Sequence, residues 1–119
     1  MVQPGNTGFH WSEVDKKWDK WDNYQFRTSL NHPIAQSGFD LDFNALREAD
    51  ATVLLLPCGR SAHLEAGFAV GQGKPLYIML TGKEEPELLY KLAKAICVTT
   101  YELRDELKKY QEILESSIR

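Results

Sequence analysis

Two short apolar runs in the middle of the chain constrain its fold more than any other feature. The first, Thr52-Val-Leu-Leu-Leu56, is stopped by Pro57, and the second, Pro75-Leu-Tyr-Ile-Met-Leu80, is followed by the turn residues Thr81 and Gly82. Unbroken apolar runs of this length are typical of parallel strands covered on both faces. We therefore expect two buried strands of one parallel sheet, with residues 52–56 as a central strand.

Helical patterns alternate with these runs. We expect an amphipathic helix at 39–49 that ends at Asp50, a polar turn at 58–61, a helix rich in small residues at 62–71, a helix from about Pro86 to Ala95, a third strand at 97–99 and a final helix at 101–118. Such alternation implies a parallel sheet between layers of helices. The predicted fold class is α/β, with a three-layer, Rossmann-like (flavodoxin-like) sheet.

The first part of the chain, residues 1–37, has a different character. Its first ten residues read as loop, Ser12 can cap a helix that carries Val14, Trp18 and Trp21, and a second helical stretch runs from about 23 to 30. Its aromatic residues fit a core or an interface, and alternatively a surface on which a base stacks. No linker separates it from the α/β core at 38–119, so we expect a single domain over 1–119.

Composition excludes several classes of function. The 119 residues suit one hydrophobic core, and a formal net charge of −3 does not favour a nucleic acid polymer as partner. No apolar run approaches a membrane span and the start of the chain lacks signal-peptide features, so we expect a cytoplasmic protein. Cys58 and Cys97 lack metal-ligand spacing, and we expect no metal, no disulfide and no cofactor.

The turn at Cys58, Gly59, Arg60 and Ser61 is the predicted substrate-binding segment. In open parallel sheets, ligands bind beyond the carboxyl ends of the strands, where turns and helix N-termini converge. Gly59 lets the backbone approach a ligand, Arg60 offers a planar cation and Ser61 a hydroxyl, a set that suits a phosphate. Alternatively this is an ordinary turn in which Ser61 caps the next helix and Arg60 is solvated.

Two acidic residues are the predicted catalytic groups. Glu65 lies four residues after Ser61, among the small residues Ala62, Ala66 and Ala69, which leave room for a ligand. Its carboxylate can act as a nucleophile or as a general acid or base, or it can be a solvated helix residue. Asp42 falls within the apolar stripe of the predicted helix at 39–49. A carboxylate in such a stripe is expected to have either an interaction partner or a functional role.

The run from Ala49 to Pro75 resembles the core motif of the nucleoside 2-deoxyribosyltransferase-like superfamily. The matching elements are Ala49-Asp50 before the strand, then Glu65, Gly67 and Ala69 in the helix, and a closing Gly73-Lys-Pro75. This resemblance implies cleavage or transfer at the N-glycosidic bond of a nucleoside or nucleoside 5′-monophosphate. Glu65 would attack the anomeric carbon and Asp42 would assist departure of the base, a chemistry related to that of retaining glycosidases.

The sequence departs from the family at its start, where members carry an additional strand and helix. Without this unit the sheet would expose an edge, which favours self-association, and the family often dimerises; we therefore expect a homo-oligomer, most simply a dimer. Two other functions stay open: a non-catalytic nucleotide-binding or interaction module of the same fold, and a flavodoxin-like protein that binds another phosphorylated ligand.

Overall fold

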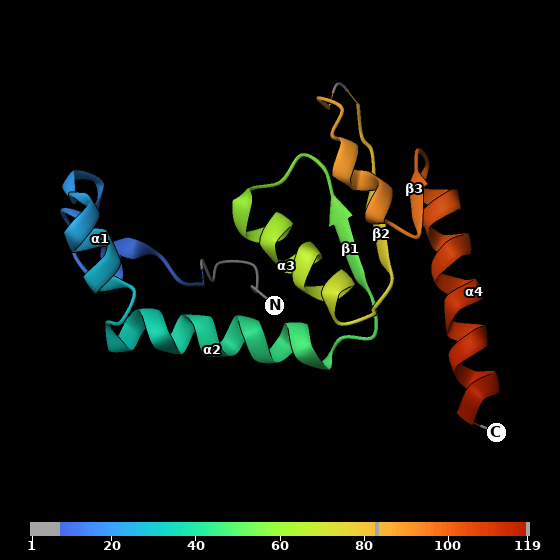
Figure 1. Ribbon diagram of the computed structural model, residues 1–119, viewed down its shortest axis with the longest axis horizontal. Helices are drawn as coiled ribbons and strands as arrows, with labels where there is room; N and C mark the ends of the chain where they lie inside the picture. Colours follow the sequence, from blue (N-terminus) through green and yellow to red (C-terminus); the bar gives the residue numbers. More distant parts are fainter. Residues whose placement is uncertain (1–7, 83, 119) are drawn as a thin grey trace. The chain divides into compact units, whose positions relative to one another are not determined.

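The computed structural model describes residues 8–82 and 84–118 of the chain (Figure 1). These residues belong to two compact units, Met1–Glu48 and Ala49–Arg119, which we describe separately. Most of the loop predicted for the first ten residues lies outside the described part. Within the described part, no helix is both long and apolar enough to cross a membrane.

The second unit contains a parallel three-stranded sheet. Its strands are β1 (Thr52–Leu55), β2 (Leu76–Met79) and β3 (Ala95–Cys97), in the order β1-β2-β3. The predicted α/β class with a parallel sheet is confirmed. The prediction of residues 52–56 as a central strand is wrong: all four residues of β2 are buried, whereas β1 lies at the edge of the described sheet. An apolar run does not distinguish a central strand from an edge strand, because the edge strand β1 also carries apolar side chains that are exposed, Val53 and Leu55.

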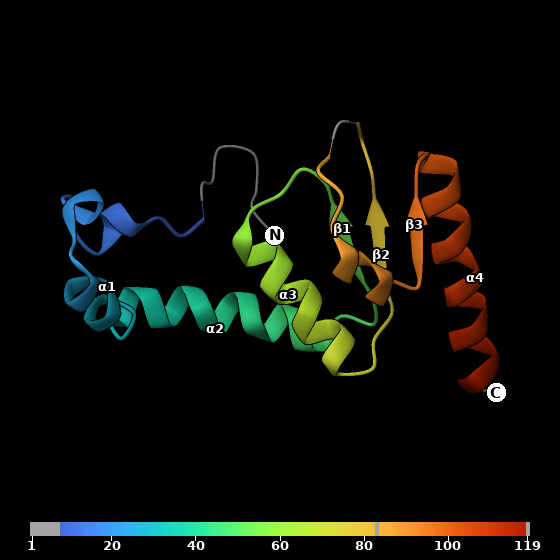
Figure 2. The same cartoon turned by 45° about the horizontal axis from the view of Figure 1, so that its top comes forward.

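Helices cover both faces of this sheet (Figures 1 and 2). Helix α3 (Arg60–Gly71) packs on β1 and β2 and, together with the 3-10 helix η3 (Leu88–Leu92), covers the face that carries Leu54 and Ile78. Helix α4 (Thr100–Ile118) packs against β2 and β3. The buried core on the α3 side is small and consists mainly of short and branched aliphatic side chains: Leu54, Leu56, Ala66, Leu76 and Ile78.

The segment between β2 and β3 contains less helix than we predicted. In place of a helix from Pro86 to Ala95 there is one short 3-10 segment, whose first turn is capped by the Glu87 side chain. The chain is already extended at Ala93, because β3 begins at Ala95 rather than at Cys97. The third strand therefore takes the residues that a longer helix would need.

The first unit is helical, and its start differs from the prediction. Two 3-10 helices, η1 (Trp11–Glu13) and η2 (Trp18–Lys20), replace the predicted helix, and His10 rather than Ser12 caps η1. Asp15 explains the interruption: its carboxylate accepts hydrogen bonds from the backbone N–H of Lys17 and from the indole N–H of Trp21, which holds a turn where a helix would continue.

The remaining helices of this unit are α1 (Asn23–Ser29) and α2 (Pro33–Glu48). The predicted stretch at 23–30 is confirmed, while α2 begins six residues before the predicted start at 39. Pro33 occupies its first position, where the missing N–H costs nothing, and His32 Nδ1 accepts the N–H of Ile34 at 3.1 Å. The helix continues through Gly38, and Phe9 packs so closely on this position that a Cβ would lie 3.2 Å from its ring.

Candidate functional site

The turn after β1 leads directly into α3. Gly59 is the N-cap residue of α3, it contributes no side-chain cap, and a Cβ at this position would meet open space. Ser61 is therefore the second residue of the helix and not its cap, contrary to the alternative we considered. Arg60 and Ser61 are both exposed at this helix start.

An open cleft lies beside this turn, at the carboxyl ends of β1 and β2. Its volume is about 540 Å³, and it is lined by Leu56, Pro57, Cys58, His63, Glu84, Glu85, Pro86, Glu87 and Tyr90. The cleft therefore combines the turn after β1, the first turns of α3 and the segment that leads into η3. Three of these lining residues are glutamates, which makes the described wall acidic.

Three residues of the cleft form a connected polar cluster. His63 Nδ1 lies 2.9 Å from the carbonyl oxygen of Gly59 and 3.7 Å from Cys58 Sγ, and His63 Nε2 lies 2.8 Å from the hydroxyl of Tyr90. Because a carbonyl oxygen only accepts, Nδ1 carries the proton, and in the neutral ring Nε2 accepts from Tyr90. Burial and, next, the neighbouring Cys58 raise the pKa of Tyr90, so its phenol keeps the proton that it donates.

A second set of hydrogen bonds fixes the loop on the other side of the cleft. Thr81 donates its hydroxyl to the carbonyl oxygen of Leu56 at 2.6 Å, which ties the end of β2 to the end of β1. Glu84 accepts hydrogen bonds from the backbone N–H groups of Thr81 and Gly82, and the bond from Thr81 is the main reason for its lowered pKa. The ionised carboxylate of Glu84 therefore stabilises this loop.

Glu65 lies on a different side of α3 from the cleft. It is exposed in the second turn of the helix, and no described residue forms a hydrogen bond or ion pair with its carboxylate. At 3.6 residues per turn, residues two positions apart point roughly 160° away from each other, so Glu65 faces away from His63 and η3. Its neighbours along the helix include the buried Ala66 and the partly buried Ala62, which pack toward the sheet.

The predicted site residues thus lie in four places. Cys58 lines the cleft, Arg60 and Ser61 lie at the exposed start of α3, and Glu65 lies one turn further along. Asp42 is exposed on α2 in the first unit, where Phe39 and Phe43 stack with centroids 5.3 Å apart. Its cooperation with Glu65 stays a prediction.

Sequence reasoning did not select His63 and Tyr90. His63 follows Gly59 by one helical turn, a spacing that places its ring near the start of α3, so the sequence held a usable signal for it. Tyr90 is 27 residues away along the chain. Nothing in the local sequence indicates that η3 would bring its hydroxyl to the imidazole.

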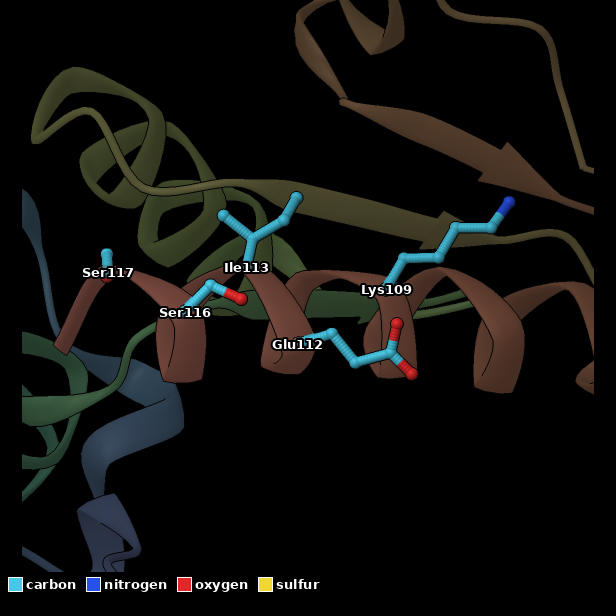
Figure 3. Close-up of a pocket in the computed structure, with 5 residues that line it drawn as sticks. All are labelled: Lys109, Glu112, Ile113, Ser116 and Ser117. Atoms are coloured by element: carbon cyan, nitrogen blue, oxygen red, sulfur yellow. The ribbon is translucent and has the colours of Figure 1, made fainter. Parts of the chain in front are cut away.

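A further hollow lies along α4 and does not form a comparable site. Figure 3 shows that its labelled residues, Lys109, Glu112, Ile113, Ser116 and Ser117, all come from that one helix. A strip on one exposed helix lacks the convergence of several elements that ligand sites usually show.

Comparisons with known proteins do not identify a relative. No family model, no curated protein and no solved structure matches the chain. Among the described residues there is also no group of three or more His, Cys, Asp or Glu side chains placed to hold a metal ion.

Proposed function

We propose that this chain cleaves or transfers the N-glycosidic bond of a nucleoside or nucleoside 5′-monophosphate, with the fold of the nucleoside 2-deoxyribosyltransferase-like superfamily. The observation that carries the proposal is the placement of Glu65. Its carboxylate is exposed, has no partner among the described residues and lies in the second turn of the helix that follows the parallel strand β1. A free carboxylate beside small alanines can approach a sugar ring.

The chemistry assigned to Glu65 is nucleophilic attack on the anomeric carbon. The bond from that carbon to the base nitrogen breaks as the bond to a Glu65 oxygen forms, and the base leaves with a proton from an acid. Water or a second base then displaces Glu65. Because the transition state resembles an oxocarbenium ion, an anionic carboxylate close to it lowers the barrier. Asp42 is the proposed proton donor.

Arg60 and Ser61 are the proposed binding residues for the 5′-phosphate. Both are exposed at the N-terminal end of α3, where free backbone N–H groups and the helix dipole favour an anion. An Arg guanidinium can form two parallel hydrogen bonds with phosphate oxygens. Gly59 and Cys58 complete the proposed segment, and this set favours a nucleotide over a free nucleoside.

The experiment that tests this function is a base-release assay. We incubate the purified chain with a panel of nucleosides and their 5′-monophosphates and measure free base by chromatography. Glu65→Gln should lower base release at least a hundredfold, because the amide cannot act as the nucleophile. Glu112→Gln, at an exposed glutamate of α4, is the matched control and should leave the rate unchanged.

Two outcomes would reject parts of this assignment. Undiminished base release by Glu65→Gln would remove Glu65 as the nucleophile. In the same assay Arg60→Ala should reduce base release from monophosphates far more than base release from nucleosides. Equal reductions for both substrates would contradict a phosphate role for Arg60.

The alternative function is a nucleotide-binding or interaction module without catalysis. It is favoured by the exposure of Glu65, since the described residues around it do not enclose a substrate. Saturable binding of a nucleotide in calorimetry, without base release from any member of the panel, would select this alternative.

A further inference from the structure

We propose that a second cleft, at the carboxyl ends of β2 and β3, binds a flat, uncharged heterocycle that carries an amino group, with adenine as the simplest example. This cleft shares only Glu84 with the cleft beside α3, and its described lining contains none of the residues assigned to the N-glycosidic reaction. The proposal rests on the shape of the cleft, on an exposed aromatic ring in its wall and on the polar groups around that ring.

Several elements converge on this cleft. Met79 and Thr81 come from the end of β2 and the loop after it, whereas Val98 and Tyr101 come from the end of β3 and the start of α4. In Figure 2 the carboxyl ends of both strands and the start of α4 lie on the same side of the sheet. Open parallel sheets bind ligands beyond this edge. The volume of about 810 Å³ lies within the roughly 300–1,000 Å³ of small-molecule sites.

The wall of the cleft carries two apolar side chains that the fold leaves in contact with water. Tyr101 is 78% exposed and Val98 is 61% exposed. The guanidinium of Arg104 lies over the ring of Tyr101, 6.0 Å from the ring centroid, and so takes one face of that ring. The opposite face can stack on a flat ring system, a contact that tolerates any heterocycle with a π face.

Polar groups suited to a heterocycle lie next to the ring. The backbone N–H groups of Thr100 and Tyr101 belong to the first turn of α4, where N–H groups have no partner within the helix. On the other side of the cleft, Glu84 Oε2 accepts the N–H of Gly82 at 3.0 Å, and a carboxylate oxygen has a second lone pair. A ring nitrogen can therefore accept from the start of α4, and an amino group can donate to Glu84.

The charges around the cleft disfavour an anion. Glu84 lines the cleft, and Glu102 places a second carboxylate beside it, where it accepts the N–H of Val98 at 2.7 Å. Among the described lining residues there is no lysine or arginine to offset these charges. Two carboxylates at this distance from a ligand repel a phosphate. We therefore expect an uncharged ligand in this cleft, unlike the nucleotide proposed for the start of α3.

The test titrates the full chain, labelled with ¹⁵N, with adenine and follows the backbone amides by two-dimensional NMR. The largest shifts should be at Gly82, Thr100 and Tyr101. Tyr101→Ala should weaken adenine binding at least fivefold, whereas Tyr101→Phe should bind like the parent because stacking needs only the ring. Tyr24→Ala, at a 72% exposed tyrosine of the first unit, is the matched control and should also bind like the parent.

Two further ligands test the chemistry of the cleft. Purine has the ring system of adenine without the amino group, and it should bind at least threefold more weakly, because it cannot donate to Glu84. Adenosine 5′-monophosphate should bind to this cleft no more tightly than adenine, because its phosphate meets the carboxylates of Glu84 and Glu102.

Several results would overturn the proposal. These are the absence of saturable shifts with adenine, shifts confined to residues 58–61, unchanged affinity in a Tyr101→Ala protein that is folded by circular dichroism, or an equal loss in Tyr24→Ala. Purine that binds as tightly as adenine would contradict the role of the amino group, and monophosphate that binds more than fivefold tighter through the same amides would contradict an uncharged ligand. Adenine has no N-glycosidic bond, so these outcomes do not depend on base release.

Discussion

Tyr77 is a polar residue in an environment that, within the described part of the chain, offers its hydroxyl no hydrogen bond. Its side chain is fully buried, its hydroxyl has no hydrogen-bond partner among the described residues, and burial is the main cause of its raised pKa. A buried hydroxyl without a partner costs about 1–3 kcal/mol of desolvation. Tyr77→Phe should therefore leave the free energy of unfolding unchanged or raise it by up to about 1 kcal/mol, as measured by urea denaturation.

The control for this prediction is Tyr110→Phe. The Tyr110 hydroxyl donates to the carbonyl oxygen of Asp50 at 3.3 Å, so its removal should lower stability slightly, in the opposite direction. A loss of more than about 1 kcal/mol in Tyr77→Phe would show that the Tyr77 hydroxyl has a partner, such as a buried water.

At the scale of elements, the loop from β2 to η3 depends on one carboxylate. Glu84 accepts from the backbone of Thr81 and Gly82, and these bonds hold its pKa below the ordinary value of 4.5. A carboxyl group whose pKa is lowered by folding stabilises the folded state at pH values above its ordinary pKa. This stabilisation is lost as the pH falls through the lower pKa that the group has in the folded state. The parent should therefore be more stable than Glu84→Gln at pH 7, with a difference that shrinks below about pH 4.5.

Thermal unfolding of the two proteins between pH 7 and pH 3 measures this difference. Glu112→Gln, at an exposed residue of α4, serves as the control for loss of one charge. A gap between the parent and Glu84→Gln that stays constant across this range would mean that the ionised carboxylate does not hold the loop.

The elements differ in how well the sequence predicts them, for physical reasons. Strand β2 and helix α4 lie within one residue of their predicted bounds, because a continuous apolar run and a long amphipathic period each point to one structure. The 3-10 segments depend instead on individual contacts, such as the Asp15 bond to the Trp21 indole, which lies six residues away. Such contacts exist only after the chain has folded.

The same distinction applies to the candidate site. The position of Cys58 just after a strand follows from the local sequence pattern. Tyr90 lines the same cleft only because η3 folds back beside the turn. The sequence identifies the turn where chemistry is expected. It does not identify the side chains that the next crossover places beside that turn.

At the scale of the second unit, the outer edge of β1 is one of the two edges at which no further strand pairs in the described sheet. In a parallel pair alternate residues bond the neighbour, and Thr52 and Leu56 donate toward β2, to Pro75 and Met79. The N–H groups of Val53 and Leu55 therefore point outward, and their side chains are 40% and 58% exposed. Unpaired strand edges of this kind pair with other chains.

We propose that a second copy of the chain covers this edge in a homodimer, since a two-fold axis brings two identical β1 edges together. Light scattering coupled to size exclusion should give the mass of a dimer, and Leu55→Lys should shift it to a monomer, because a charge at a buried interface is costly. Leu88→Lys, at a 77% exposed leucine of η3, is the matched control and should remain dimeric. A parent that is monomeric at every concentration, or a Leu88→Lys variant that dissociates equally, would show that the β1 edge is not the dimer contact.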